Sequence, residues 1–217
     1  MNPTREEILI VDDKPANLKL LTQVLAGQGY RVRAASSGKL ALESVRASPP
    51  HLILLDIKMP EMNGYEVCES LKADELTRDI PVIFISALDY VQEKVRGFRV
   101  GGVDYITKPF QVEEVLARVE THLGLRRLQK QLQDSNARMV RELQLAALTQ
   151  ANFMPRQLPR LDGWQMSATL IPARETSGDF FDVFPLPGGN WGVLIADVVD
   201  KGVAAALGPK GKRHIVS

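Results

Sequence analysis

Residues 52–64 read LILLDIKMPEMNG, an apolar run followed by an aspartate and a polar turn that contains a proline. The run Leu52–Leu55 does not alternate with polar residues, so it is typical of a parallel strand covered on both faces. The run Val82–Ile85 has the same character. Because such strands occur in α/β proteins, these two stretches predict an α/β fold for the N-terminal part of the chain.

Short β-branched runs alternate with longer amphipathic segments on both sides of this stretch. The pattern predicts five strands, at Ile8–Val11, Tyr30–Ala35, Leu52–Leu55, Val82–Ser86 and Asp104–Thr107. It also predicts five helices, at Pro15–Gln28, Gly38–Ala47, Gly64–Ala73, Asp89–Val100 and Val112–Leu123. Strands and helices that alternate in this way indicate an open, doubly wound parallel sheet.

Composition narrows the classes of protein to consider. The chain has 217 residues and a hydrophobic share of 45%, which is ordinary for a folded globular protein. A net charge of +1, and the lack of a helix-turn-helix pattern after residue 123, argue against DNA as a partner. The single cysteine, Cys68, excludes an intrachain disulfide and has the spacing of a buried helical residue. Without a membrane-spanning run or a signal peptide, we expect a cytoplasmic protein.

Polar residues stand at the carboxyl ends of four predicted strands. They are Asp12 and Asp13, Asp56, Ser86 and Lys108. Because the carboxyl ends of parallel strands meet at one edge of a doubly wound sheet, we expect these side chains to converge there. Three carboxylates so close together repel one another unless a cation or a proton is present. Mg²⁺ suits such a site because it prefers hard oxygen ligands and keeps waters that a phosphate can replace.

Phosphoryl transfer is the chemistry that this cluster predicts. Asp56 would be the nucleophile and would form an acyl phosphate. Asp12 and Asp13 would hold the metal ion, which neutralises charge during the transfer. Lys108 would place a positive charge beside the phosphoryl oxygens, and the Ser86 hydroxyl would donate a hydrogen bond to one of them. A lone aspartate at a strand end is more often a helix cap or a turn residue, but the joint pattern favours the functional interpretation.

The same residues resemble the receiver domain of two-component response regulators, over residues 7–122. The matching stretches are ILIVDD (8–13), LLDIKMPEMNG (54–64), ISA (85–87) and DYITKPF (104–110). The resemblance implies a flavodoxin-like fold and phosphorylation by a sensor histidine kinase or a phosphotransfer protein. It implies Mg²⁺ coordination by Asp13, Asp56 and the backbone carbonyl of Lys58.

The resemblance also implies a conformational switch. In such a switch Ser86 moves toward the phosphate, and the aromatic ring of Tyr105 turns inward. The alternative for Tyr105 is an ordinary, half-buried aromatic residue on a strand.

The segment after residue 123 predicts a different kind of structure. From Leu123 to about Asn152 the pattern is continuously helical and rich in Leu, Gln and Arg. Apolar residues from Leu125 to Leu143 roughly follow a coiled-coil seam, with a polar interruption at Ser135–Asn136. This seam motivates the hypothesis that the chain forms a homodimer through its linker helix.

Residues 143–207 resemble the start of a metal-dependent serine/threonine phosphatase domain of the SpoIIE/RsbU kind. The matching stretches are LQLAALTQANFMPRQLP (143–159), PARETSGDFFD (172–182) and IADVVDKGVAAAL (195–207). The resemblance implies that Asp179, Asp197 and the backbone carbonyl of Val198 hold a pair of Mn²⁺ or Mg²⁺ ions. It implies a phosphoserine substrate in an anti-sigma-factor antagonist. From the residues alone, a turn or cap role for both aspartates stays open.

Three segments are therefore predicted: a receiver domain at 1–123, a helical linker at 124–158 and an incomplete, α+β phosphatase-like segment at 159–217. Thr176-Ser177 stands where the phosphatase family usually has Val-Gly, and the last segment is too short to build that domain's core. We expect a truncated or frameshifted chain without phosphatase activity. Two outputs stay open: the regulatory half of a phosphatase, or a non-enzymatic module that dimerises or binds a partner when phosphorylated.

Overall fold

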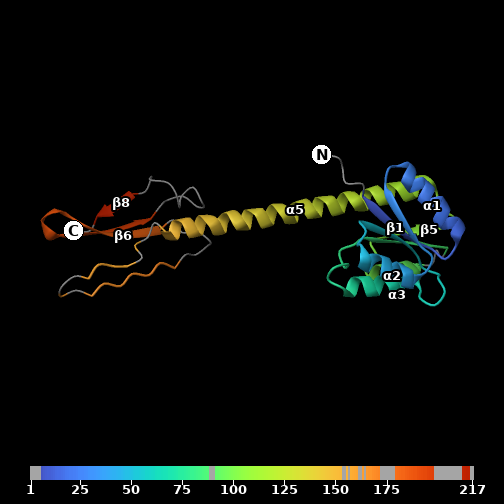
Figure 1. Cartoon of the computed structure of the whole chain (residues 1–217), viewed down its shortest axis with the longest axis horizontal. Coiled ribbons are helices and arrows are strands. Elements are labelled where there is room, and N and C mark those ends of the chain that lie inside the picture. The colour runs from blue at the N-terminus through green and yellow to red at the C-terminus, as the bar shows by residue number, and fades with distance from the viewer. Residues whose placement is uncertain are drawn as a thin grey trace. The chain divides into compact units, whose positions relative to one another are not determined.

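The computed structural model describes residues 6–87, 91–152, 155, 157–160, 163, 165–171, 179–197 and 212–215. The chain divides into two compact units, Met1–Lys130 and Gln131–Ser217. Figure 1 shows the helices and strands of both units.

A five-stranded parallel sheet forms the centre of the first unit. Its strands are β1 (Glu7–Val11), β2 (Arg31–Ala35), β3 (Leu52–Asp56), β4 (Val82–Ser86) and β5 (Asp104–Thr107). Their order in the sheet is β2-β1-β3-β4-β5, and every neighbouring pair is parallel. The predicted doubly wound, flavodoxin-like sheet is confirmed.

Three strand bounds differ from the sequence prediction, and in β1 the difference is that the strand begins at Glu7 and not at Ile8. Asp56 is the last residue of β3, paired with Ile85 of β4, and does not follow the strand as predicted. Tyr30 lies outside β2 because its N–H donates to the carbonyl of Leu25 at the end of the preceding helix. Asp56 is therefore held by the sheet ladder itself, which fixes its backbone.

The first unit also contains four complete helices and the start of a fifth. They are α1 (Pro15–Gly27), α2 (Gly38–Ala47), α3 (Gly64–Ala73), α4 (Val91–Arg99) and α5 (Val112–Asn152). Helix α4 ends one residue before the predicted Val100, because the chain turns at Gly101, which has a φ of +98°. The predicted start of this helix, Asp89, lies outside the described residues.

Each face of the sheet buries its own apolar cluster. On one face, strand residues pack against Leu21 and Leu25 of α1 and Val115, Val119 and Leu123 of α5. On the other face, alternate strand residues pack against Ala41 and Val45 of α2 and Val67, Cys68 and Leu71 of α3. Figure 1 shows α1 on one side of the sheet and α2 and α3 on the other. Burial on both faces explains why β3 and β4 are apolar without alternation.

Helix α5 runs without a break for 41 residues, so the last helix of the receiver continues into the predicted linker as far as Asn152. Beyond Leu123, two arginines of α5 form hydrogen bonds with other residues of the first unit. Arg126 donates to the backbone carbonyls of Pro50 and His51, and Arg127 donates to Glu6 at 2.7 Å. The apolar side chains of α5 beyond Leu123 include several that are exposed: Leu125, Leu128, Leu132, Met139 and Val140.

The second unit contains an antiparallel sheet of β6 (Asp179–Pro185), β7 (Trp191–Asp197) and β8 (Lys212–Ile215), in the order β6-β7-β8. A short 3₁₀ turn, η1 (Pro187–Gly189), joins the first two strands; Gly188 and Gly189 have positive φ there. Val198 lies outside the described residues. Within the described part of the chain, no helix combines the length and the apolar character needed to cross a membrane.

Candidate metal centre

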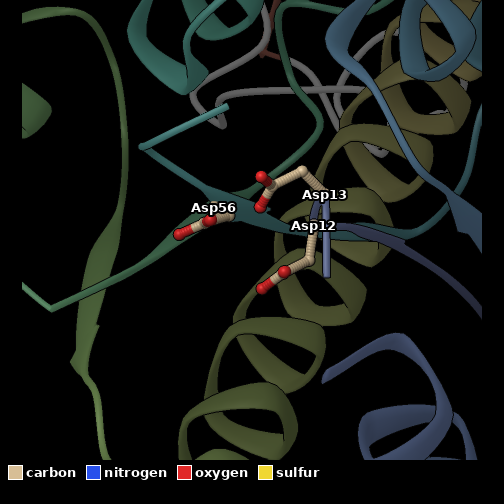
Figure 2. Close-up of side chains that lie close together, drawn as sticks. All are labelled: Asp12, Asp13 and Asp56. Carbon is tan, nitrogen blue, oxygen red and sulfur yellow. The ribbon is translucent and has the colours of Figure 1, made fainter. Parts of the chain in front are cut away.

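Three carboxylates meet at the carboxyl edge of the first sheet. Asp12 and Asp13 follow β1 and Asp56 ends β3, and β1 and β3 are neighbours in the sheet. Each side chain offers an oxygen atom, and these atoms lie within 4.8 Å of one another. Figure 2 shows the three side chains grouped at the ends of the two strands. In the described part of the chain, this is the one group of three or more potential metal-binding side chains.

Lys108 enters this cluster from the end of β5. Its Nζ lies 2.7 Å from Asp12 Oδ2 and 3.0 Å from Asp56 Oδ1, so one ammonium group bridges two carboxylates. Its backbone N–H donates to the carbonyl of Ser86 at 2.7 Å, and the peptide bond to Pro109 is cis. Burial lowers the pKa of Lys108, but its contacts with Asp12 and Asp56 outweigh this and raise the pKa above its ordinary value. The ammonium group therefore stays charged.

The two adjacent aspartates have unlike surroundings. Asp12 is fully buried and accepts hydrogen bonds from Asn17, from the backbone N–H of Lys14 and from Lys108. By contrast, Asp13 Oδ1 is buried and has no hydrogen-bond donor among the described residues. Burial raises the pKa of Asp56 above its ordinary value, and Lys108 opposes this only in part.

These residues fit a hard divalent cation. Three carboxylates against one ammonium group leave two negative charges to be compensated, and the buried Asp13 Oδ1 lacks a partner. Carboxylate oxygens are ligands that Mg²⁺ prefers. Lys58, two residues after Asp56, lines the same surface pocket as Asp13.

The loop after Asp56 is packed so tightly that it requires a glycine. A Cβ atom on Gly64 would overlap the carbonyl oxygen of Asp56 and would lie 2.9 Å from the Cα of Ile57. The side chain of Asn63 caps α3 through the N–H groups of Tyr65 and Glu66 and so fixes where the helix begins. The Asn-Gly pair at the end of the quoted motif thus positions the backbone of Asp56.

Ser86 on β4 and Tyr105 on β5 are two residues apart in register, since the direct cross-strand partner of Tyr105 is Phe84. The Ser86 side chain is buried, and Tyr105 is 7% exposed, packed toward Phe84 with ring centroids 6.4 Å apart. Burial raises the pKa of Tyr105, and a hydrogen bond with Ser86 acts in the opposite direction. Tyr105 is therefore buried in this structure, and its role in a switch stays a prediction.

Tyr65 makes a contact that sequence analysis did not find. Its hydroxyl lies 2.8 Å from Glu93 Oε2 and 3.0 Å from the Glu93 carbonyl, so it donates to α4. The guanidinium group of Arg96 lies 4.5 Å from the centre of its ring. Burial, together with the Glu93 hydrogen bond, raises the pKa of Tyr65. The start of α3 is thus joined to α4 through one phenol.

The family model for the response regulator receiver domain matches residues 8–120. The chain belongs to this family. Receiver domains bind Mg²⁺ at an acidic pocket and take a phosphoryl group from histidine kinases or phosphotransfer proteins. The family match ends at residue 120, so it lends no support to the predicted phosphatase-like segment.

Curated relatives share the receiver domain with this chain. A probable cyclic di-GMP phosphodiesterase of Vibrio cholerae is 46% identical over 129 residues, which are 59% of this chain and 29% of the relative. The DNA-binding dual master transcriptional regulator RpaA of Synechocystis is 45% identical over 116 residues, which are 54% of this chain and 48% of the relative. The DNA-binding response regulator MtrA of Mycolicibacterium smegmatis is 39% identical over 123 residues, 57% and 53% of the two chains. This receiver thus spans between a quarter and about half of such relatives.

Solved receiver structures agree with the fold. The signal receiver domain of a histidine kinase from Syntrophus aciditrophicus is 35% identical, with a TM-score of 0.52 over 55% of this chain and 90% of that one. The receiver domain of Francisella response regulator 1452 is 28% identical, with a TM-score of 0.53 over 55% of this chain and 98% of that one. Both structures correspond to the first unit alone in extent.

A second acidic pair lies on the sheet of the second unit. Asp179 of β6 is the direct cross-strand partner of Asp197 of β7. Asp179 lines a pocket with Phe181 and Val193, while nothing is described for the Asp197 side chain.

Proposed function

We propose that this chain is a response regulator in which Asp56 accepts a phosphoryl group from the phosphohistidine of a kinase or phosphotransfer protein. An Asp56 carboxylate oxygen attacks phosphorus, so an O–P bond forms while the P–N bond to histidine breaks. The observation that carries this proposal is the contact of 3.0 Å between Asp56 Oδ1 and the Lys108 ammonium, beside Asp12 and Asp13. Such a kinase would act in the cytoplasm.

Each neighbour of Asp56 has a proposed role. Asp13, Asp56 and the backbone carbonyl of Lys58 would hold Mg²⁺, with Asp12 beside them; when bound, the ion neutralises charge on the phosphoryl oxygens. Lys108, already 3.0 Å from Asp56, would pair with one of those oxygens. Ser86 ends β4, the neighbour of β3, so its hydroxyl would donate a hydrogen bond to another.

Ser86 and Tyr105 together would report the phosphorylated state. A serine hydroxyl that donates to the phosphate turns away from the Tyr105 hydroxyl, to which it is now hydrogen bonded. The change at Asp56 would thereby reach β5. Substitution of Ser86 by alanine should leave phosphorylation possible but uncouple it from Tyr105, which tyrosine fluorescence of the phosphorylated protein would detect.

Acetyl phosphate, a small phosphodonor, provides the test. Protein incubated with acetyl phosphate and Mg²⁺ should gain the mass of one phosphoryl group, whereas Asp56→Asn should gain nothing. Asp134→Asn, an equivalent change at an exposed position on α5, is the matched control and should behave as the wild type. A wild type without the adduct, or an Asp56→Asn protein that carries it, contradicts the proposal.

For the output we propose a metal-dependent protein serine phosphatase region. Its support is the register of β6 and β7, which places Asp179 opposite Asp197. These aspartates and the Val198 carbonyl would hold Mn²⁺ or Mg²⁺ and activate water toward a phosphoserine of an anti-sigma-factor antagonist. Mn²⁺-dependent hydrolysis of such a substrate, lost in Asp179→Asn, would support this. No hydrolysis by a protein that contains the whole output region would contradict it.

Dimerisation through α5 is the alternative output. The exposed side chains of Leu125, Leu128 and Leu132 are spaced by three and four residues along the helix, as in a coiled-coil seam, and Met139 follows seven residues after Leu132. Sedimentation of the phosphorylated wild type against a Leu128→Glu, Leu132→Glu double variant tests this. A dimer in the wild type alone is expected; equal monomer masses would exclude it.

A further inference from the structure

Asn17 makes a contact that the chemistry proposed above does not explain. It lies in the first turn of α1, which begins at Pro15. Its side-chain Nδ2 lies 3.0 Å from Asp12 Oδ1 and 2.8 Å from Asp12 Oδ2. Since a carboxylate can only accept hydrogen bonds, the amide must turn its NH₂ group toward Asp12, and the assignment of nitrogen and oxygen is fixed.

Asn17 completes the hydrogen bonding of Asp12. Oδ1 accepts from the Lys14 N–H at 2.9 Å and from Asn17, while Oδ2 accepts from Asn17 and from Lys108 at 2.7 Å. A carboxylate has about four lone-pair sites, so these contacts use the accepting capacity of Asp12. Oδ1 of the adjacent Asp13 is buried and receives no donor from any described residue.

We propose that Asn17 is a positioning residue of the metal centre, which keeps Asp12 as the anchor of Lys108 and sets the preference of the site for Mg²⁺ over Ca²⁺. The inference rests on the proposed Mg²⁺-dependent function of Asp56. With Asp12 occupied by Asn17 and Lys108, the open carboxylates are those of Asp13 and Asp56.

Ion preference follows from the number of available oxygens. Mg²⁺ requires a compact octahedral shell, is usually held by one or two carboxylates and retains several waters. Ca²⁺ takes six to eight oxygens and gains from each extra carboxylate. Removal of the Asn17 amide frees a lone pair on each oxygen of Asp12. One oxygen of Asp12 lies within 4.8 Å of one oxygen of Asp13 and one of Asp56. The freed oxygens therefore favour Ca²⁺ more than Mg²⁺.

Two variants and one control separate this role from a general effect on the fold. Asn17→Ala removes the amide, and alanine is the better helix former, so α1 keeps its stability. Asn17→Leu keeps the approximate volume of the side chain and removes its polar amide group. Asn136→Ala makes the same change at an exposed position on α5, far along the chain from the cluster. Circular dichroism verifies that each protein is folded.

Isothermal titration of each whole-chain protein with Mg²⁺ alone and with Ca²⁺ alone measures the preference. In Asn17→Ala and Asn17→Leu, Ca²⁺ affinity should rise about tenfold, the equivalent of one charge-assisted hydrogen bond released. Mg²⁺ affinity should change by less than about threefold, because its shell does not gain a ligand. Asn136→Ala should match the wild type for both ions.

The outcomes distinguish this inference from the proposed function. A wild type that binds Mg²⁺, with an unchanged Ca²⁺-to-Mg²⁺ affinity ratio in both Asn17 variants, overturns the role of Asn17 alone. A parallel fall of both affinities also overturns it, since that is the result of a merely structural role. If Asn17→Ala does not fold, Asn17→Leu decides. A wild type that binds neither ion overturns the proposed function and this inference together.

Discussion

Substitution of Gly64 by alanine should disturb both the stability and the chemistry of the receiver. The added Cβ would overlap the carbonyl oxygen of Asp56 and lie 2.9 Å from the Cα of Ile57. Both are backbone atoms at the end of a buried strand, so neither can move as a flexible side chain does. Overpacking against such atoms costs about 1–3 kcal/mol. For a domain of this size, that lowers the Tm by roughly 4–11 °C.

Gly124 offers a control with the opposite expected sign. It lies within α5, and a Cβ there would meet only Arg127 Nη2 at 3.7 Å, which is an ordinary contact. Because glycine in a helix interior is less stable than alanine by about 0.8–1.0 kcal/mol, Gly124→Ala should raise the stability. Urea unfolding followed by circular dichroism measures both changes in the free energy of unfolding.

Gly64→Ala should also slow the phosphorylation of Asp56. Gly64→Ala forces the backbone at Asp56 to shift, so its carboxylate loses its alignment with Lys108, 3.0 Å away. The rate of phosphorylation by acetyl phosphate should fall in Gly64→Ala and stay unchanged in Gly124→Ala. A Gly64→Ala protein with wild-type stability and wild-type rate would refute the assignment of a packing role to this glycine.

Three further changes test other parts of the structure. Hydrogen bonds from His122, the Tyr105 N–H and Arg118 outweigh burial and hold the pKa of Asp104 below its ordinary value. The charged Asp104 therefore stabilises the fold above about pH 4, and this stabilisation is lost as the pH falls through the folded-state pKa of Asp104. The loss of stability caused by Asp104→Asn should accordingly become smaller at acidic pH. Tyr65→Phe removes the hydrogen bond to Glu93 and should cost about 1–2 kcal/mol, measured by urea unfolding, with Glu93→Gln retaining most of it. Cys68 is buried, which raises its thiol pKa to about 11, so a thiol reagent at pH 8 should modify it only after denaturation; modification of the native protein would contradict its burial.

Much of the receiver fold can be predicted from the sequence because its helices and strands have clear local sequence patterns. Helices Gly38–Ala47 and Gly64–Ala73 have the predicted bounds, since Ser37 and Asn63 are polar caps whose side chains accept backbone hydrogen bonds. The alternation of strands and helices along the chain predicts the parallel sheet. In such a sheet the carboxyl ends of the strands meet, which brings Asp12 and Asp56 together. Predictions that depend on hydrophobic periodicity and on the order of the elements can therefore be made without knowing the tertiary contacts.

Other features depend on side-chain contacts between distant residues. Asn17 was not recognised because an asparagine in a first helical turn looks like a surface residue until its amide is placed against Asp12. Tyr65 and Glu93 are 28 residues apart, and no local pattern connects them. The inward position of Tyr105 is likewise set by packing against Phe84.

Identification of the phosphorylated residue tests most directly whether Asp56 accepts the phosphoryl group. Protein treated with acetyl phosphate and Mg²⁺ is reduced with borohydride, which converts an acyl phosphate into a stable alcohol, and its peptides are sequenced by mass spectrometry. We expect modification at Asp56 alone, and we expect a chelator of divalent cations to abolish it. Modification at another residue, or at Asp56 in the presence of the chelator, would contradict it.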